Sequence, residues 1–291
     1  MTTAPGQNAL APLSLTYASA SDGWTARTAI RAIEILSGQL RLKRLYDLYQ
    51  AEMMGSVDFW EAALRLLQLR VAYDAAKLAT LPASGPLVIV ANHPFGLVDG
   101  ILVGHLANRV RRDFKVLTNA RLYPPDAEIQ RFILPIDFDP TPEAKAVTLR
   151  TRALARQHLT TGGCLIVFPA GGVATTPTPF ARRAIDDDWK PFTARLIHAA
   201  QADVVPMFFH GQNSRLFQIA SHVSMTTRMA FLLHEVANKI GSEFRVSIGD
   251  VLPYATLQPL RDPHQLSRYL RTRTDWLGNP AARPGFAGII A

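Results

Sequence analysis

The chain has 291 residues, of which 48% are hydrophobic, and its 31 basic and 23 acidic residues give a formal net charge of +8. This length and composition predict a globular protein with a well-filled core, and the absence of any run of about 18 apolar residues argues against a membrane-spanning helix. The positive charge favours anionic lipid or nucleic acid as a partner. No recognition-helix pattern, zinc-finger spacing or RNA-binding aromatic signature is present, so we expect an anionic membrane surface and no nucleic acid.

The first 81 residues predict a leader followed by helices. Residues 1–22 are rich in Ala, Pro, Ser and Thr and are expected to form a flexible leader and not a signal peptide. Residues 23–81 are expected to be helical, because apolar side chains recur at three- and four-residue spacing over 24–49 and again over 58–73. Both helices could cover a core, and the first, which is basic, could instead lie in a membrane headgroup layer.

Residues 82–278 alternate between strand-like and helical patterns, with no internal repeat. This alternation predicts an α/β domain with a mostly parallel sheet flanked by helices. The expected strands cover 87–91, 114–118, 165–168, 204–209 and 244–248, and the expected helices cover 101–110, 148–159 and 193–201. Cys164 precedes one apolar run and is expected to be buried, fitting a reducing cytoplasm. The final residues, 279–291, contain Pro and Gly and are expected to form an irregular tail.

The most informative stretch follows the first expected strand and reads Asn92-His93-Pro94-Phe95-Gly96-Leu97-Val98-Asp99. Imidazole titrates near neutral pH and can take a proton from a hydroxyl, while a carboxylate on its other nitrogen fixes the tautomer. Pro94 and Gly96 favour a turn that would bring Asp99 back to His93. The pattern therefore predicts a catalytic base with its partner. The alternative is a strand-to-helix turn in which the histidine only hydrogen-bonds backbone.

Two later strand ends carry residues suited to the same site. The turn Phe168-Pro169-Ala170-Gly171-Gly172 would expose backbone N–H groups that can stabilise an oxyanion, and its alternative is an ordinary loop. A second polar strand end could line an acceptor pocket or support the fold, and it contains His210, Asn213 and Ser214. An apolar run at 132–137, ending in Asp137, lies between the first two strand ends in sequence.

Charged residues elsewhere have competing interpretations. Arg182 and Arg183 could clamp an anion, or could form a solvated basic face that balances the three aspartates at 186–188. Consecutive carboxylates in a loop usually stay in water, so no metal is expected there. His234 and Glu235 begin like a zinc-protease helix but lack the second histidine, and we expect them on a helix surface.

Taken in order, these segments resemble the lysophospholipid or glycerolipid acyltransferase family. Its hallmark is Asn-His with a following Asp, then Phe-Pro-Glu-Gly and a Val-Pro strand, and the likeness covers roughly residues 82–253. A bacterial branch labelled hemolysin-like or putative acyltransferase is most similar. In that branch Asn-His-Pro-Phe-Gly, Phe-Pro-Ala-Gly and His-Gly-Gln-Asn-Ser-Arg-Leu-Phe-type segments occur together.

The resemblance implies an α/β acyltransferase fold and direct transfer of a fatty acyl group to the hydroxyl of a lysophospholipid or related lysolipid. The donor would be an acyl carrier protein or coenzyme A thioester, acting as co-substrate with no further cofactor. His93 would be the general base and Asp99 its orienting partner. Asn92, Gly96 and the residues of the two later strand ends would bind substrate or the oxyanion. Such an enzyme of lipid metabolism would work peripherally at the cytoplasmic face of the cell membrane.

Departures from the family pattern affect the expected substrate. Five residues separate His93 from Asp99, where four are usual, and Ala170 replaces the glutamate of Phe-Pro-Glu-Gly. The arginine expected soon afterwards is absent around Val173, and Phe138 stands where many members carry a phosphate-binding arginine. We therefore do not expect phosphate recognition of the kind found in glycerol-phosphate acyltransferases. A lyso-ornithine or other amino-acid lipid would fit the missing phosphate ligands, and the choice between a phospholipid and an amino-acid lipid acceptor stays open. The rival functions are a non-catalytic, membrane-perturbing lipid-binding protein and a thioester hydrolase.

Overall fold

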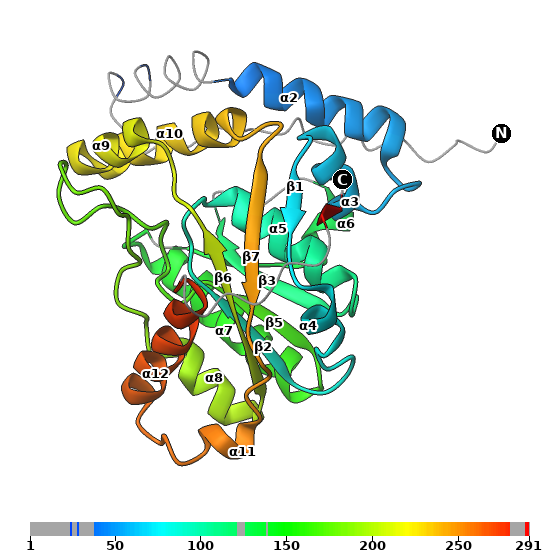
Figure 1. The fold of residues 1–291 in the computed structure, drawn as a ribbon, viewed down its shortest axis with the longest axis vertical. Coiled ribbons are helices and arrows are strands. Elements are labelled where there is room, and N and C mark those ends of the chain that lie inside the picture. The colour runs from blue at the N-terminus through cyan, green and yellow to red at the C-terminus, as the bar shows by residue number, and fades with distance from the viewer. Residues whose placement is uncertain are drawn as a thin grey trace.

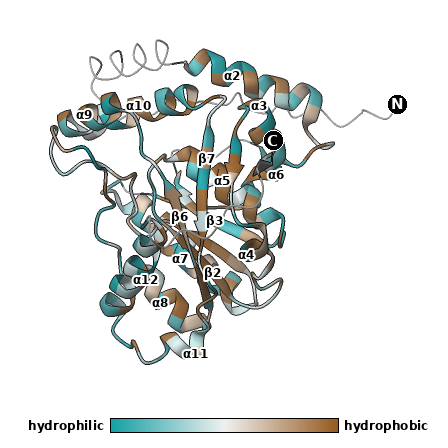
Figure 2. Ribbon diagram, viewed as in Figure 1, coloured by the Kyte–Doolittle hydropathy of each residue, from teal (hydrophilic) through white to brown (hydrophobic). Residues whose placement is uncertain are grey.

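The strand β2 (Leu87–Ala91) lies at the centre of the fold and is buried along its whole length. Successive strand side chains point to opposite faces of a sheet. Accordingly Leu87, Ile89 and Ala91 belong to one hydrophobic cluster, and Val88 and Val90 belong to a second. A strand buried on both faces reads as a continuous apolar run, which is the pattern seen in the sequence. Figure 2 colours β2 as hydrophobic.

The computed structural model describes residues 38–120, 126–137, 139–279 and 289–290, together with Trp24 and Thr28. Within these residues one eight-stranded sheet has the order β4-β3-β5-β2-β6-β7-β1-β8 (Figure 1). The first five strands in that order run parallel, whereas β7 is antiparallel to β6, β1 is parallel to β7, and β8 is antiparallel to β1. The remaining strand bounds are β1 (Arg70–Ala72), β3 (Phe114–Asn119), β4 (Ile133–Ile136), β5 (Cys164–Val167), β6 (Asp203–His210), β7 (Glu243–Ile248) and β8 (Ile289–Ile290).

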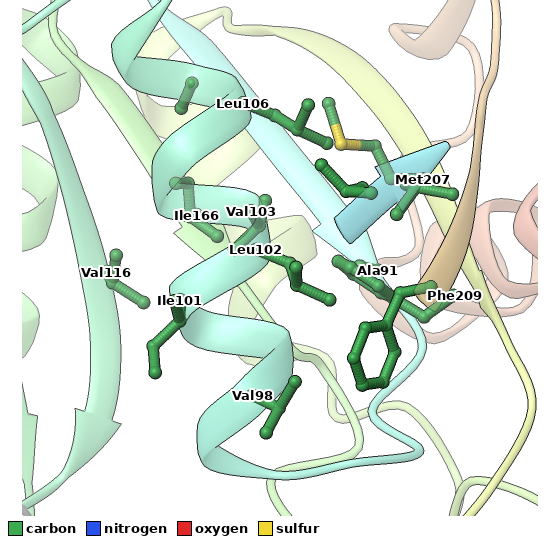
Figure 3. Close-up of a cluster of buried hydrophobic side chains, with 14 of the residues drawn as sticks. Ala91, Val98, Ile101, Leu102, Val103, Leu106, Val116, Ile166, Met207 and Phe209 are labelled. Carbon is green, nitrogen blue, oxygen red and sulfur yellow. The ribbon is translucent and has the colours of Figure 1, made fainter. Parts of the chain in front are cut away.

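Helices cover both faces of the sheet, as predicted for an α/β protein. One face carries α3 (Phe59–Leu66), α4 (Ala75–Ala79), α5 (Leu97–Asn108) and α10 (Met225–Asn238). The other carries α7 (Pro142–Thr160), α8 (Phe192–Ala200), α11 (Tyr254–Leu257) and α12 (Pro263–Leu277). Figure 3 shows the apolar side of α5, where Val98, Leu102 and Leu106 lie close to Ala91, Met207 and Phe209 of the strands. The expected fold class is confirmed.

The N-terminal segment differs from its prediction. Residues 1–22 and most of 23–37 lie outside the described residues, and the first predicted helix is described as α2 (Gln39–Leu48) continuing into a π-helical turn η1 (Tyr49–Met53). The second predicted helix ends early, because the chain reverses at Gln68 (φ 52°) and residues 70–72 pair with β7 as a strand. Val71 and Ala72 are buried apolar residues that fit a strand as well as a helix, so the helical spacing alone predicted a helix that extends too far.

Two further helices, α9 (Arg215–Val223) and α10, follow β6, and a short helix α6 (Ala127–Gln130) precedes β4. Helix α10 contacts both α9 and α2, and Figure 1 shows the three together at one end of the molecule. The described helices include none that combines the length and apolarity needed to cross a bilayer. Most of the predicted irregular tail lies outside the described residues, and its last part contains β8.

Candidate active site

His93 and Asp99 meet where β2 ends and α5 begins. Oδ2 of Asp99 accepts hydrogen bonds from Nδ1 of His93 at 3.0 Å and from the N–H groups of Phe95 and Gly96 at 2.8 and 2.9 Å. Gly96 caps the helix at φ +76°, a left-handed backbone conformation that glycine adopts without strain. The Pro-Gly turn thus places the carboxylate against the imidazole, as predicted from the sequence.

The two partners differ in access to solvent. The Asp99 side chain is fully buried, whereas the His93 side chain is 18% exposed. Burial raises the pKa of Asp99, and its hydrogen bonds from His93, Phe95 and Gly96 oppose that rise. Because the carboxylate accepts from Nδ1, the neutral imidazole carries its proton there and leaves Nε2 as an acceptor. This arrangement can take a proton from a hydroxyl that approaches Nε2.

The loop after β5 packs against one face of the imidazole ring of His93. The ring of Phe168 stacks on that of His93, with centroids 4.2 Å apart, and the N–H of Ala174 donates to the His93 carbonyl at 2.8 Å. The N–H of Gly171 is engaged with the Phe168 carbonyl at 3.0 Å, so it is not free to stabilise an oxyanion. Among the described residues, the Gly172 N–H has no partner. The carbonyl of Pro169 accepts from the N–H of Lys190 at 2.9 Å.

Asp186 is a site residue that the sequence analysis missed. Its Oδ1 accepts the N–H of His93 and its Oδ2 accepts the indole N–H of Trp189, each at 3.1 Å. Burial raises the pKa of this carboxyl group. The expectation that all three aspartates stay in water is therefore wrong for Asp186, while Asp187 and Asp188 are exposed. No local pattern distinguishes the first aspartate, since only the packing of its loop against β2 does so.

The remaining predicted residues make contacts within the protein. The side-chain amide of Asn92 donates to the Phe209 carbonyl at 3.0 Å and accepts its N–H at 2.7 Å, which ties the end of β2 to β6. Nε2 of His210 lies 2.8 Å from the hydroxyl of Ser247, on β7. These contacts tie β2 to β6 and β6 to β7.

Ser214 and Asn213 lie at the start of α9. Ser214 accepts the N–H of Phe217 as the helix cap, while its own hydroxyl and N–H donate to Glu235. Glu235 is fully buried, so the expectation that it lies on a helix surface is wrong. Asn213 is 2% exposed, and neither polar atom of its amide has a partner among the described residues.

The predicted anion clamp lies on an exposed loop. Arg182 and Arg183 are exposed, and in the described part of the chain neither guanidinium forms a hydrogen bond or ion pair. Arg228 of α10, which sequence analysis did not single out, instead reaches the loop after β5 and donates to the Val173 carbonyl. Phe138, at the position of the usual phosphate-binding arginine, lies outside the described residues.

Comparison with known proteins finds a matching family model, two similar sequences and a solved structure. A family model described as acyltransferase matches residues 22–282. The chain is similar to two proteins named lyso-glycine lipid O-acyltransferase. The one from Bacteroides thetaiotaomicron is 28% identical over 229 residues, covering 74% of this chain and 78% of the relative, and the one from Phocaeicola vulgatus is 23% identical over 222 residues, covering 74% and 76%. The crystal structure of the 1-acyl-sn-glycerophosphate acyltransferase PlsC from Thermotoga maritima aligns with a TM-score of 0.49, 14% identity and 89% coverage of both chains.

Proposed function

The chain belongs to the acyltransferase family whose model it matches, and we propose that it transfers a fatty acyl group from a thioester to the hydroxyl of a lysolipid. The observation that carries the proposal is the contact between His93 and the buried Asp99 carboxylate at the end of β2. A thioester is already activated, so the enzyme has to deprotonate the alcohol, hold both reactants and stabilise the developing negative charge.

In the proposed reaction, Nε2 of His93 takes the hydroxyl proton as the acceptor oxygen attacks the thioester carbonyl. The carbonyl oxygen becomes an oxyanion, for which the free N–H of Gly172 is the candidate donor. Collapse of the tetrahedral intermediate forms the new ester and breaks the C–S bond. The departing thiolate takes the proton from the imidazolium, which Asp99 has stabilised meanwhile. No acyl-enzyme intermediate is required, and acyl carrier protein or coenzyme A can serve as the carrier.

We propose that the acceptor is an amino-acid lysolipid. The two relatives named above act on lyso-glycine lipid, according to their names. Ala170 and Val173 stand where the family pattern expects a glutamate and an arginine, so the usual phosphate recognition is absent from this loop. Acylation of a lysolipid of this class would make the protein an enzyme of lipid metabolism.

The lipid acceptor implies contact with a membrane surface, and we propose that α9 and the adjoining loop provide it. Helix α9 exposes Leu216, Ile219 and Val223, which recur at three- and four-residue spacing on one side of the helix. Phe180, 88% exposed, lies in the loop whose carbonyls at 179 and 181 accept from Arg215 of α9. Arg182 and Arg183 on that loop suit anionic lipid. Contact would be peripheral, at the cytoplasmic face where thioester carriers are made.

Radiolabelled acyl transfer tests the function directly. The purified protein is given acyl coenzyme A or acyl carrier protein thioester with N-(3-hydroxyacyl)glycine, and His93→Ala is compared with His264→Ala, which changes an exposed histidine on α12. We expect His93→Ala to lower transfer about 1,000-fold, the range of general base catalysis, and the control to match the parent protein. Release of free fatty acid without transfer would indicate the hydrolase instead, and lipid binding without either product would indicate the non-catalytic alternative.

A further inference from the structure

The guanidinium of Arg228 lies beside the loop that carries the imidazole. Its Nη2 donates to the carbonyl of Val173, and a Cβ atom placed on Gly172 would lie 3.4 Å from the same nitrogen. Leu232, one helical turn later on α10, reaches to 3.2 Å from where a Cβ on Gly96 would stand. Helix α10 therefore lays one face across both turns of the site, the turn of Gly96 and the turn of Gly172.

The described residues provide no carboxylate that pairs directly with the positive charge of Arg228. The side chain is partly buried, and burial lowers its pKa, with Asp187 as the charged group that opposes this effect. No carboxylate of the described residues lies within 4.0 Å of the guanidinium, whose only hydrogen bond there is the one to Val173. A guanidinium has five N–H donors, and a partly desolvated charge is unfavourable unless it is paired. An anion supplied from outside the chain would pair with this charge and accept hydrogen bonds from the remaining donors.

We propose that Arg228 binds the anionic headgroup of the lysolipid acceptor, and that this anion is a carboxylate. The inference rests on the proposed acyl transfer and adds the residue that selects the acceptor. Arg228 and His93 both contact the loop 168–174, so a headgroup held at Arg228 would direct the rest of the acceptor past the imidazole. Arg228 is thus a positioning residue for the acceptor, with no part in the proton transfer.

A carboxylate suits this site better than a phosphate monoester does. The planar guanidinium matches the two oxygens of a carboxylate, and a single positive charge neutralises a monoanion. A doubly charged phosphate would leave an unpaired negative charge near Asp187, which already acts on the arginine. The two arginines of the predicted clamp, Arg182 and Arg183, are exposed, and neither guanidinium forms a hydrogen bond or ion pair within the described residues.

The test compares an acceptor with and without its charge. Acyl transfer from acyl coenzyme A is measured with N-(3-hydroxyacyl)glycine and with its methyl ester, which keeps the reacting hydroxyl but has no anion. We expect the protein to prefer the acid by about 100-fold in kcat/KM, as charge-assisted hydrogen bonds suggest. Arg228→Gln should bring this ratio close to one, mainly through a higher KM for the acid, and Arg228→Lys should restore part of it. Arg195→Gln removes an exposed charge on α8 and should keep the ratio.

The outcomes separate this inference from the proposed function. Equal rates on acid and ester with the unaltered protein would overturn the role of Arg228 without any variant, even if Arg228→Gln failed to fold. An equal loss on both acceptors in a folded Arg228→Gln would also overturn it, because the arginine would then only support the loop. Faster transfer to lysophosphatidate than to the acid would refute the carboxylate. Transfer to none of the three acceptors would overturn the proposed function itself.

Discussion

Nδ1 of His93 and Oδ2 of Asp99 lie 3.0 Å apart, and the carboxylate is held in that position by two backbone N–H groups of the intervening turn. We predict that Asp99→Asn lowers kcat for acyl transfer roughly 1,000-fold or more. An amide cannot stabilise the imidazolium and does not enforce the productive tautomer.

Stability should respond differently to the same change. The pKa of Asp99 is raised by burial, so the folded protein holds this proton more tightly than the unfolded chain, and ionisation disfavours folding as pH rises above the ordinary value of 3.8. A neutral amide removes that penalty. Thermal unfolding of Asp99→Asn at pH 7 should therefore show a melting temperature no lower than that of the parent. A clearly lower melting temperature together with full activity would contradict both predictions.

The contact between His93 and Asp99 was predictable because its signals are local. A continuous apolar run predicts the buried strand, and Pro94 with Gly96 predicts the turn that returns Asp99 to His93. Asp186 was not predictable in this way, because its contact with the His93 N–H depends on how a loop 93 residues later packs against β2.

Two other features depended on long-range packing. Strand β1 has three residues and owes its extended conformation to pairing with β7, more than 170 residues later in the chain. The helical spacing of the preceding segment therefore led to a predicted helix that runs past its true end. Arg228 lies in a helix that no motif marks, and only the packing of α10 over the 168–174 loop brings it to the site. Residues that act through contacts distant in sequence leave no pattern for single-sequence analysis to detect.

Cys164 should be chemically inert in the folded protein and dispensable for catalysis. It is fully buried in β5, and burial raises the pKa of its thiol to about 12, so almost no thiolate is present at neutral pH. We predict no reaction with a thiol reagent in the native protein and one reacting group per chain after denaturation. Cys164→Ala should keep acyl transfer within about twofold while losing about 1 kcal/mol of stability from the smaller side chain. Loss of transfer in a stably folded variant would instead indicate a covalent acyl-enzyme.

Membrane binding should depend on the exposed apolar face of α9. Replacing Leu216, Ile219 and Val223 together with serine should weaken partition to vesicles containing anionic lipid by about tenfold or more, because each side chain contributes apolar area to the interface. Vesicle sedimentation measures the change.

A matched triple variant on α7 serves as the control. Val147, Leu149 and Leu154 are also exposed but lie on a helix of the opposite sheet face, and their replacement with serine should leave partition unchanged. Transfer to a soluble short-chain acceptor should persist in the α9 variant. Equal vesicle binding by both triple variants would assign membrane contact to another surface.

The ion pair between Arg111 and Asp113 should give the fold a pH-dependent stability. Nε and Nη2 of the buried arginine donate to the two carboxylate oxygens at 2.6 and 2.5 Å, while other donors bond the carbonyls of Gly85 and Gly162, so the pair joins three loops at one end of the sheet. The hydrogen bonds from Arg111 lower the pKa of Asp113 below its ordinary value of 3.8.

A depressed carboxyl pKa contributes stability that is present above pH 3.8 and is lost as pH falls through the folded-state value. Asp113→Asn should therefore lower the free energy of unfolding by about 1 kcal/mol at pH 7, a modest amount because the carboxylate is 48% exposed. The difference from the parent should shrink below pH 3.8, as urea unfolding measured from pH 7 to pH 3 would reveal. Asp188→Asn, which removes a 98% exposed partner of Arg271, should show little change at any pH. A constant difference across that range would mean that packing, and not the charge of Asp113, stabilises the three loops.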